Sequence, residues 1–383
     1  MSAPRAAFPE QALPPWRRAV LKVGSSLLSE AGALSDRNAR GLARFMAAVQ
    51  AQKREVVLVS SGAVAAGRAH ACTNPQGGNG IVLRQALAAL GQMRMMALWQ
   101  GLIEVPAAQV LLSHDDLRNR RRYLNARNTL LELLRLGALP VVNENDTVAV
   151  EELKLGDNDN LAAIVAALVD ADVLLIASDI DGLYSGHPLH DALAQPVPYV
   201  AAITPRILAM AGDAGSVLGT GGMRTKLQAA QKAASSGIDT LLFNGADAAV
   251  VEGLSAGMLR GTRFAAAGTR LAARKYWLRH APGAAAAIRV DAGAARALIA
   301  GKSLLPGGIV GVQGEFARGD IVAVAEGEEQ RVVARGLCQY GAGEVRRLAG
   351  RHTRDIDGVL GFSYGDSIIR RDDLVLMMEE VPA

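Results

Sequence analysis

A lysine and two glycine–serine turns stand at the ends of two predicted strands. Lys22 lies near the end of the apolar run 18–23, which leads into the Gly-Ser-Ser turn 24–26. The next run, 55–60, leads into the Ser-Gly-Ala turn 61–63. Backbone amides in such turns approach an anion closely, and ligands of open α/β sheets bind at the carboxyl ends of the strands. Each turn alone fits ordinary turn chemistry, but two at successive strand ends favour an anion-binding edge.

A dense polar block follows another predicted strand. The segment 143–146, Asn-Glu-Asn-Asp, comes directly after the apolar run 139–142, and Gly-Asp-Asn-Asp-Asn follows at 156–160. A solvated loop with a helix N-cap at Asn160 would explain only part of this block. Amides and carboxylates together suit a zwitterionic amino acid, because they accept from its ammonium group and donate to its carboxylate. A divalent metal ion is the alternative ligand.

Two further segments have the composition of a nucleotide site. The sequence 219–226, Gly-Thr-Gly-Gly-Met-Arg-Thr-Lys, precedes a predicted helix at 227–235. Glycines and threonines ahead of a helix form a cradle for phosphate oxygens. Ser178 and Asp179 follow the predicted strand 173–177 and place a hydroxyl and a carboxylate at one more strand end, although a plain Asp-Gly turn is the alternative.

The sequence lacks the signature motifs of several common enzyme classes. No P-loop is present, because Arg296 stands where the Gly301-Lys302-Ser303 segment would need its first glycine. Arg224 replaces the third glycine of a dinucleotide fingerprint. The six histidines have no zinc-ligand spacing, and Val59 stands where a serine-hydrolase elbow around Ser61 needs glycine. Hydride transfer, zinc chemistry and serine hydrolysis are therefore disfavoured.

The elements that must position these residues alternate between strands and helices. The chain has 383 residues, 50% of them hydrophobic and only 4% aromatic, which is typical of large α/β enzymes built from aliphatic side chains. We expect an α/β fold with a mostly parallel sheet sandwiched by helices. The expected strands are 18–23, 55–60, 109–112, 139–142, 173–177 and 240–243, and the expected helices are 38–53, 64–67, 124–136, 161–169 and 227–235.

The pattern of predicted secondary structure changes after about residue 284. Short strand-like runs at 308–312, 321–325 and 331–336 are separated by glycines and acidic turns, which predicts a small β-rich domain. The Pro-Gly-Ala segment 281–287 is the natural boundary. The sequence thus predicts three parts: a loose N-terminal extension 1–16, a domain 17–280 and a second domain 285–383.

The composition also indicates in which cellular environment the protein works. No apolar run reaches the roughly 18 residues of a membrane-spanning helix, and the two cysteines are too few and too distant in sequence for a disulfide framework. Both observations favour a reduced, cytoplasmic protein. A net charge of +4 does not by itself imply a nucleic-acid partner.

Short motifs recur at the ends of the expected strands and helices. Before residue 280 they are VLKVGSS (20–26), VSSGAVAAG (59–67), LNARN (124–128), VVNENDT (141–147), GDNDNL (156–161), IDGLY (180–184) and GTGGMRTKLQ (219–228). After residue 300 they are SLLP (303–306), YG (340–341) and RRD (370–372). The first set resembles the amino-acid kinase family and, within it, the glutamate 5-kinases, and the second set resembles a PUA domain.

The resemblance implies transfer of the γ-phosphoryl group of ATP, with Mg²⁺, to the side-chain carboxylate of L-glutamate in the first step of proline biosynthesis. It also implies feedback inhibition by proline, a homo-oligomer and a downstream glutamyl-phosphate reductase as an associated enzyme, and it leaves the metal ligands undetermined. Its implied catalytic residues are Lys22, Lys226 and Asp159, and its glutamate-binding residues are Lys22, Ser61, Asp146 and Asn158. Its implied ATP-binding residues are Ser178, Asp179, Thr220, Gly221, Gly222, Met223, Arg224, Thr225 and Lys226. Two departures from the family pattern are Ser178, where threonine is usual, and Arg224, where small polar residues are common.

Two alternatives remain at this stage. One is a related kinase acting on another small anion such as aspartate, carbamate or UMP, which the two acidic-amide motifs disfavour. The other is an RNA-binding protein, because PUA domains elsewhere bind RNA. Residues 285–383 contain 12 basic and 14 acidic side chains, and this balance argues against a nucleic-acid partner.

Overall fold

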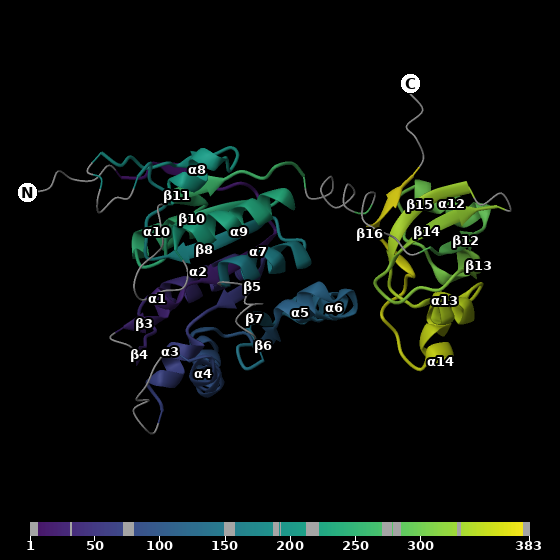
Figure 1. Ribbon diagram of the computed structural model, residues 1–383, viewed down its shortest axis with the longest axis horizontal. Helices are drawn as coiled ribbons and strands as arrows, with labels where there is room; N and C mark the ends of the chain where they lie inside the picture. Colours follow the sequence, from purple (N-terminus) through teal and green to yellow (C-terminus); the bar gives the residue numbers. More distant parts are fainter. Residues whose placement is uncertain are drawn as a thin grey trace, which may run out of the picture. The chain divides into compact units, whose positions relative to one another are not determined.

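The computed structural model describes residues 7–30, 33–71, 80–148, 158–186, 191, 193–211, 222–269, 278, 285–327 and 331–377. Figure 1 shows the chain coloured along its sequence. It divides into two compact units, the first made of Met1–Arg118 with Asn125–Arg270 and the second of Asn119–Leu124 with Leu271–Ala383. Each unit has its own sheet.

The first unit is built on a twisted sheet of nine described strands. Their order is β1-β11-β10-β8-β2-β5-β7-β6, with β9 also paired to β11. The pairs from β10 to β6 are all parallel, and only β1 and β10 run antiparallel to β11. Strands distant in sequence, such as β8 and β10, therefore lie side by side (Figure 1). The bounds are β1 Glu10–Ala12, β2 Arg18–Val23, β5 Glu55–Ser60, β6 Ala107–Leu112, β7 Leu139–Glu144, β8 Val173–Ser178, β9 Tyr199–Val200, β10 Asp239–Asn244 and β11 Met258–Phe264; a separate hairpin joins β3 Ser29–Glu30 to β4 Ala33–Leu34.

Side chains of β2 point alternately to the two faces of the sheet, and each face is covered by helices. Leu21 and Val23 belong to a buried cluster with side chains of α2, α4 and α10. Lys22 points to the opposite face, because successive strand side chains alternate, and there it meets α7. The helices are α1 Ser25–Leu28, α2 Ala39–Ala51, α3 Ala63–Arg68, α4 Ile81–Leu102, α5 His114–Arg118, α6 Arg120–Arg135, α7 Asn158–Leu168, α8 Pro205–Ala209, α9 Met223–Ser235 and α10 Ala248–Ser255.

The N-terminal segment is part of this sheet, so the expectation of a loose extension is wrong for residues 7–16. Strand β1 pairs antiparallel with Met258–Arg260 of β11. The Gln11 side chain donates to the carbonyl oxygens of Pro198 and Gly261 at 3.0 and 3.1 Å. Phe8 is buried and meets the Tyr184 ring edge to face at a centroid distance of 5.2 Å. The proline- and alanine-rich composition concealed these contacts, which are with residues about 175 to 250 positions away.

Helices α3 and α4 touch through their backbones. A Cβ atom added at Gly91 would lie 1.8 Å from the carbonyl oxygen of Ala63, and one added at Gly67 would lie 1.8 Å from that of Leu87. Neither backbone oxygen can move aside without shifting its helix. The two glycines therefore set how close α4 lies to the helix that follows β5.

Replacing Gly91 by alanine is expected to lower the free energy of unfolding by about 3 kcal/mol, because the added methyl group forces the helices apart. Gly101→Ala is the matched control on the same helix: nothing lies within 4 Å of its added Cβ. Alanine has the better helix propensity, so this control should be neutral or stabilising. Urea denaturation of both variants checks the prediction, and equal stabilities would contradict it.

The second unit contains a five-stranded sheet among its described residues, ordered β13-β12-β14-β15-β16. Only β12 and β14 are parallel within it. Its core holds the fully buried Tyr340, whose hydroxyl donates to the carbonyl of Gly365 at 2.6 Å. Burial raises the pKa of the Cys338 thiol in the same core. The elements are β12 Ala287–Val290, α12 Ala292–Ile299, η2 Pro306–Gly308, β13 Ile309–Gln313, β14 Ile321–Glu326, β15 Arg331–Cys338, α13 Ala342–Leu348, η3 Thr353–Asp355, α14 Ile356–Leu360 and β16 Ile369–Leu376.

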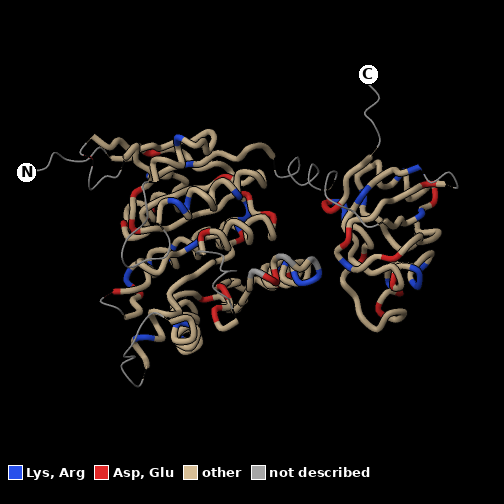
Figure 2. The backbone as a smooth tube through the Cα atoms, viewed as in Figure 1, with Lys and Arg blue, Asp and Glu red and all other residues tan. Residues whose placement is uncertain are grey.

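Charge is distributed evenly on this second unit. Figure 2 shows basic and acidic residues interspersed along its elements. Arg318 packs its guanidinium 3.5 Å from the centre of the Tyr364 ring, and desolvation lowers the pKa of this arginine. One of its basic groups is thus committed to the interior of the unit.

The expected fold class is confirmed: a mostly parallel α/β sheet between helices, followed by a smaller β-rich unit. Three boundaries differ in ways that bear on the site. α7 begins at Asn158 rather than Leu161, so Asn158 and Asp159 lie in its first turn and Asn160 is not its N-cap. β7 continues through Asn143 and Glu144, because both pair with β6, whereas we expected the strand to end at Val142. α9 begins at Met223 rather than Leu227. No helix in the described part of the chain is long and apolar enough to cross a bilayer.

Candidate active site

The central parallel strands end level with one another. Val23 of β2 is paired with Ser60 of β5 on one side and with Ala177 of β8 on the other. The predicted functional residues next to these positions are Lys22, Ser61 and Ser178. Because carboxyl ends of parallel strands share one edge, residues far apart in sequence meet there as expected.

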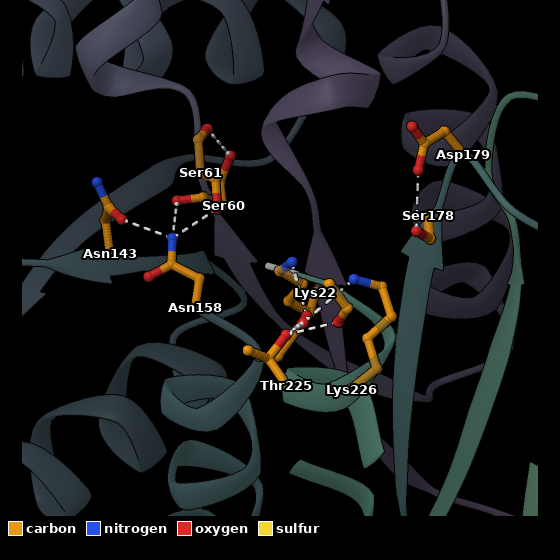
Figure 3. A network of polar contacts seen from close by, with 11 residues as sticks. Lys22, Ser60, Ser61, Asn143, Asn158, Ser178, Asp179, Thr225 and Lys226 are labelled. Carbon is orange, nitrogen blue, oxygen red and sulfur yellow. Dashed lines mark hydrogen bonds and ion pairs between the residues drawn. The ribbon is translucent and has the colours of Figure 1, made fainter. Parts of the chain in front are cut away.

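A buried charged cluster lies above this edge. The ammonium group of Lys22 lies 2.7 Å from Asp159 Oδ1, and that of Lys226 lies 3.2 Å from Asp159 Oδ2. Asp159 is completely buried, and the two lysines are 3% and 5% exposed. Lys22 comes from β2 and Lys226 from the first turn of α9, as Figure 3 shows. Asp159 comes from the first turn of α7. We refer to the three residues as the Lys22–Asp159–Lys226 cluster.

The cluster combines paired buried charges with a net positive charge. Burying charges is costly unless they are paired and hydrogen-bonded, and Asp159 faces both ammonium groups while it accepts a bond from Thr225 Oγ1 at 2.9 Å. Thr225 also lies 2.9 Å from the carbonyl oxygen of Gly222, which fixes its rotamer. Two lysines and one aspartate carry a formal net charge of +1. A phosphoryl group beside them would therefore meet two fixed positive charges in a low-dielectric site.

A network of amide side chains adjoins the Lys22–Asp159–Lys226 cluster, because Asn158 directly precedes Asp159. Asn158 Nδ2 donates to Ser61 Oγ at 2.7 Å, to Asn143 Oδ1 at 2.9 Å and to the Ser60 carbonyl at 3.2 Å (Figure 3). Gly62 follows with φ of +108°, a left-handed conformation that favours glycine. This turn starts α3 and places the Ser61 hydroxyl against Asn158. The network offers neutral polar groups next to the charged cluster.

The expected nucleotide residues lie partly within the described chain. Ser178 ends β8 and donates to Asp179 Oδ1 at 3.2 Å (Figure 3). Gly222 precedes α9, and Met223, Arg224, Thr225 and Lys226 form its first turn. Thr220 and Gly221 lie outside the described residues. The expected phosphate cradle therefore includes a helix N-terminus one turn earlier than the sequence pattern indicated.

Asp146 is half-buried in the turn that follows β7. Its neighbour Asn145 donates its backbone amide to the carbonyl of Leu112 at 2.9 Å, which anchors the turn to β6. In the second half of the polar block, residues 156 and 157 lie outside the described chain, whereas 158–160 begin α7. The role of Asp146 stays a prediction.

Comparison with known proteins identifies the family. Residues 17–244 match the amino acid kinase family and residues 286–360 match the PUA domain. A Glutamate 5-kinase from Xylella fastidiosa (strain M23) is 61% identical over 379 residues, covering 98% of this chain and 99% of that protein. A Glutamate 5-kinase from Xanthomonas oryzae pv. oryzae (strain KACC10331 / KXO85) is 63% identical over 362 residues, covering 94% and 100%. The chain belongs to the glutamate 5-kinase family.

Among solved structures, a UMP kinase from Bacillus anthracis aligns with 66% of this chain and 97% of its own, with a TM-score of 0.47 and 14% identity. The glutamate 5-kinase assignment depends on the curated relatives and the family match. It confirms the family that the motifs predicted, including its PUA domain.

Two residues next to the site of this glutamate 5-kinase family member were not predicted from the sequence. Gln92 and Trp99 of α4 contact the edge residues: Gln92 Oε1 accepts from Asn143 Nδ2 at 3.0 Å, and Trp99 Nε1 donates to Ser60 Oγ at 2.8 Å. Their spacing of seven residues places both on one face of the helix. That spacing was the available signal, but the nearly continuous apolar composition of α4 obscured it.

Proposed function

We propose that this protein transfers the γ-phosphoryl group of ATP to the side-chain carboxylate of L-glutamate, giving glutamyl 5-phosphate and ADP. The observation that carries the proposal is the 61–63% identity, over nearly the whole chain, with proteins named Glutamate 5-kinase. The geometry supports it independently, because a buried cluster of net positive charge adjoins a network of neutral amides and hydroxyls.

The chemistry requires charge neutralisation more than a strong base. The attacking carboxylate is already an anion, so the protein must hold two negatively charged groups in line and stabilise the transferring oxygens. We assign that task to Lys22 and Lys226, with Asp159 holding their ammonium groups in place. Ser61, Asp146 and Asn158 would bind glutamate.

Nucleotide binding completes the proposed mechanism. Ser178 and Asp179 at the end of β8, together with the segment 220–226, would bind ATP. Among the described residues no group of three acidic, histidine or cysteine side chains could hold a metal ion. Mg²⁺ would enter on the nucleotide phosphates, whose oxygens it prefers.

An acceptor screen tests the function. ADP release should depend on glutamate and not on aspartate, carbamate or UMP. Hydroxylamine should trap the acyl phosphate as a hydroxamate, which a phosphomonoester product would not form. Activity with one of the other acceptors alone would replace the proposal by a related kinase.

Asn158→Ala is expected to raise the KM for glutamate about 10- to 100-fold, the cost of losing a bond to a charged group. Asp146→Ala should act in the same direction, and the ATP KM should stay within about twofold for both. Asn160→Ala is the matched control, because Asn160 lies in the same turn of α7 but bonds Lys232 at 2.8 Å. Steady-state kinetics with each substrate varied checks this, and equal losses for both substrates would contradict it.

Proline inhibition belongs to the same proposed site. Proline carries the α-carboxylate and the amine-bearing carbon of glutamate but lacks the γ-carboxylate, so it would bind without being phosphorylated. Its inhibition should be overcome by glutamate, and Asn158→Ala should weaken both ligands together. The cytoplasmic location, the homo-oligomer and the association with a reductase remain predictions from the sequence.

A further inference from the structure

Gln92 has a buried donor that packing alone does not explain. Its side chain is 9% exposed, and its Oε1 accepts from Asn143. Its Nε2 is buried and has no hydrogen-bond partner among the described residues. An unpaired buried amide costs free energy that an apolar residue of similar volume would not. The amide at this position therefore indicates a role beyond filling the interior.

The hydrogen bonds around Gln92 have a fixed direction. The Ser60 carbonyl can only accept, so the group of Asn158 that faces it must be the Nδ2 donor. The same donor then requires an acceptor from Asn143, which is its Oδ1. Asn143 Nδ2 in turn requires an acceptor, which Gln92 Oε1 provides. One backbone carbonyl and Gln92 thus anchor the two ends of a chain of amides.

The direction of this chain determines which atom of Asn158 remains available. With Nδ2 committed to Ser60, Ser61 and Asn143, the other end of the amide is its Oδ1 oxygen. That oxygen accepts a hydrogen bond from an ammonium group, whereas a reversed amide would present a second donor. Reversal of Asn143 would set its Nδ2 against Asn158 Nδ2 and favour this wrong orientation.

We propose that Gln92 is a positioning residue for the amino-acid substrate: it holds the Asn143 amide, and through it orients Asn158 to accept from the substrate's ammonium group. This inference rests on the proposed function, in which Asn158 binds glutamate. Trp99, one heptad further along α4, fixes the other side of the network through Ser60 Oγ. Through these two side chains helix α4 would support the amide network and the Ser60–Ser61 turn.

Gln92→Met tests the proposal with little change in volume. The glutamate KM should rise about tenfold or more, as expected when a buried amide loses its partner, while the ATP KM changes less than about twofold. Gln100→Met is the matched control: this exposed residue of the same helix bonds the Val105 carbonyl and the Ala107 amide, away from the site. Should Gln92→Met fail to fold, Gln92→Ala carries the same expectation.

Two further variants separate positioning from simple structural support. Gln92→Glu keeps an oxygen acceptor for Asn143 and should restore most of the glutamate affinity. In an Asn143→Ala background Gln92→Met should have no additional effect, because Gln92 acts through Asn143.

Three results would overturn the inference: an unchanged glutamate KM in Gln92→Met, additive effects in the double variant, or a Gln92→Glu protein as impaired as Gln92→Met. A wild-type protein without glutamate-dependent activity would overturn the proposed function and this inference together. Normal wild-type activity together with an unchanged glutamate KM in Gln92→Met would overturn this inference alone.

Discussion

Replacing Asp159 by asparagine is expected to lower kcat about 10²- to 10³-fold, in the range found when a preorganised electrostatic group is lost. The side chain keeps its shape but loses the charge that faces Lys22 at 2.7 Å and Lys226 at 3.2 Å. Both ammonium groups are then free to leave their positions. The free energy of unfolding should also fall, by about 3 kcal/mol, because breaking a buried ion pair leaves charge uncompensated.

The affinity for ATP distinguishes this variant from a merely damaged protein. Removing a negative charge next to a polyphosphate increases attraction, so the ATP KM should not rise even though kcat falls. Asp239→Asn is the matched control, because Asp239 is also ion-paired, to Arg263 at 2.7 Å, but begins its strand at the opposite end of the sheet. Kinetics at a temperature where both variants are folded checks the result. An equal fall in kcat for the control would contradict the assignment.

Lys226→Met should also lower kcat by about 10²-fold or more, because the lysine would act mainly on charge that develops in the transition state. The ATP KM should rise here, since a positive charge is lost, whereas it should not rise in Asp159→Asn. Lys22→Met should lower kcat similarly from the β2 side. Lys232→Met controls for loss of a lysine on α9, because Lys232 is exposed and bonds Asn160 instead.

Stopped-flow or steady-state ADP release measures these effects. Activity of Lys226→Met or Lys22→Met within about threefold of wild type would contradict the assigned role. Different ATP responses in the lysine and aspartate variants would support a cluster whose net charge, and not only its shape, binds the nucleotide.

The strand ends were the predictable part of the site. Lys22 and Ser61 stand where apolar, β-branched runs give way to glycine and serine, and parallel pairing then brings these ends to one edge. Asn158 and Asp159 were recognisable from their local density of amides and carboxylates. Local composition was sufficient for these residues because each lies at a boundary between strand or helix and turn.

The remainder depended on contacts that local sequence does not encode. Asn143 was expected beyond the strand, yet pairing with β6 keeps it inside β7, where its amide is satisfied by Gln92 and Asn158. Gln92 lies 51 residues from Asn143, and the Gly67–Gly91 contact that brings α4 close is a tertiary feature. The start of α9 was missed because Met223 to Lys226 read as the end of a glycine-rich loop.

Strand β1 covers an edge of β11 that would otherwise be open to other strands. The outer edge of β11 is covered by β1 along Met258–Arg260 and by β9 along Arg263 and Phe264, and the Gln11 amide occupies the intervening position at Gly261. A protein beginning at Arg17 would leave the first of these stretches with unpaired backbone donors and acceptors, a template for strands of other molecules. Truncation to residue 17, where the match to the amino acid kinase family begins, would then yield a protein that aggregates as its concentration rises, even with the catalytic residues unchanged.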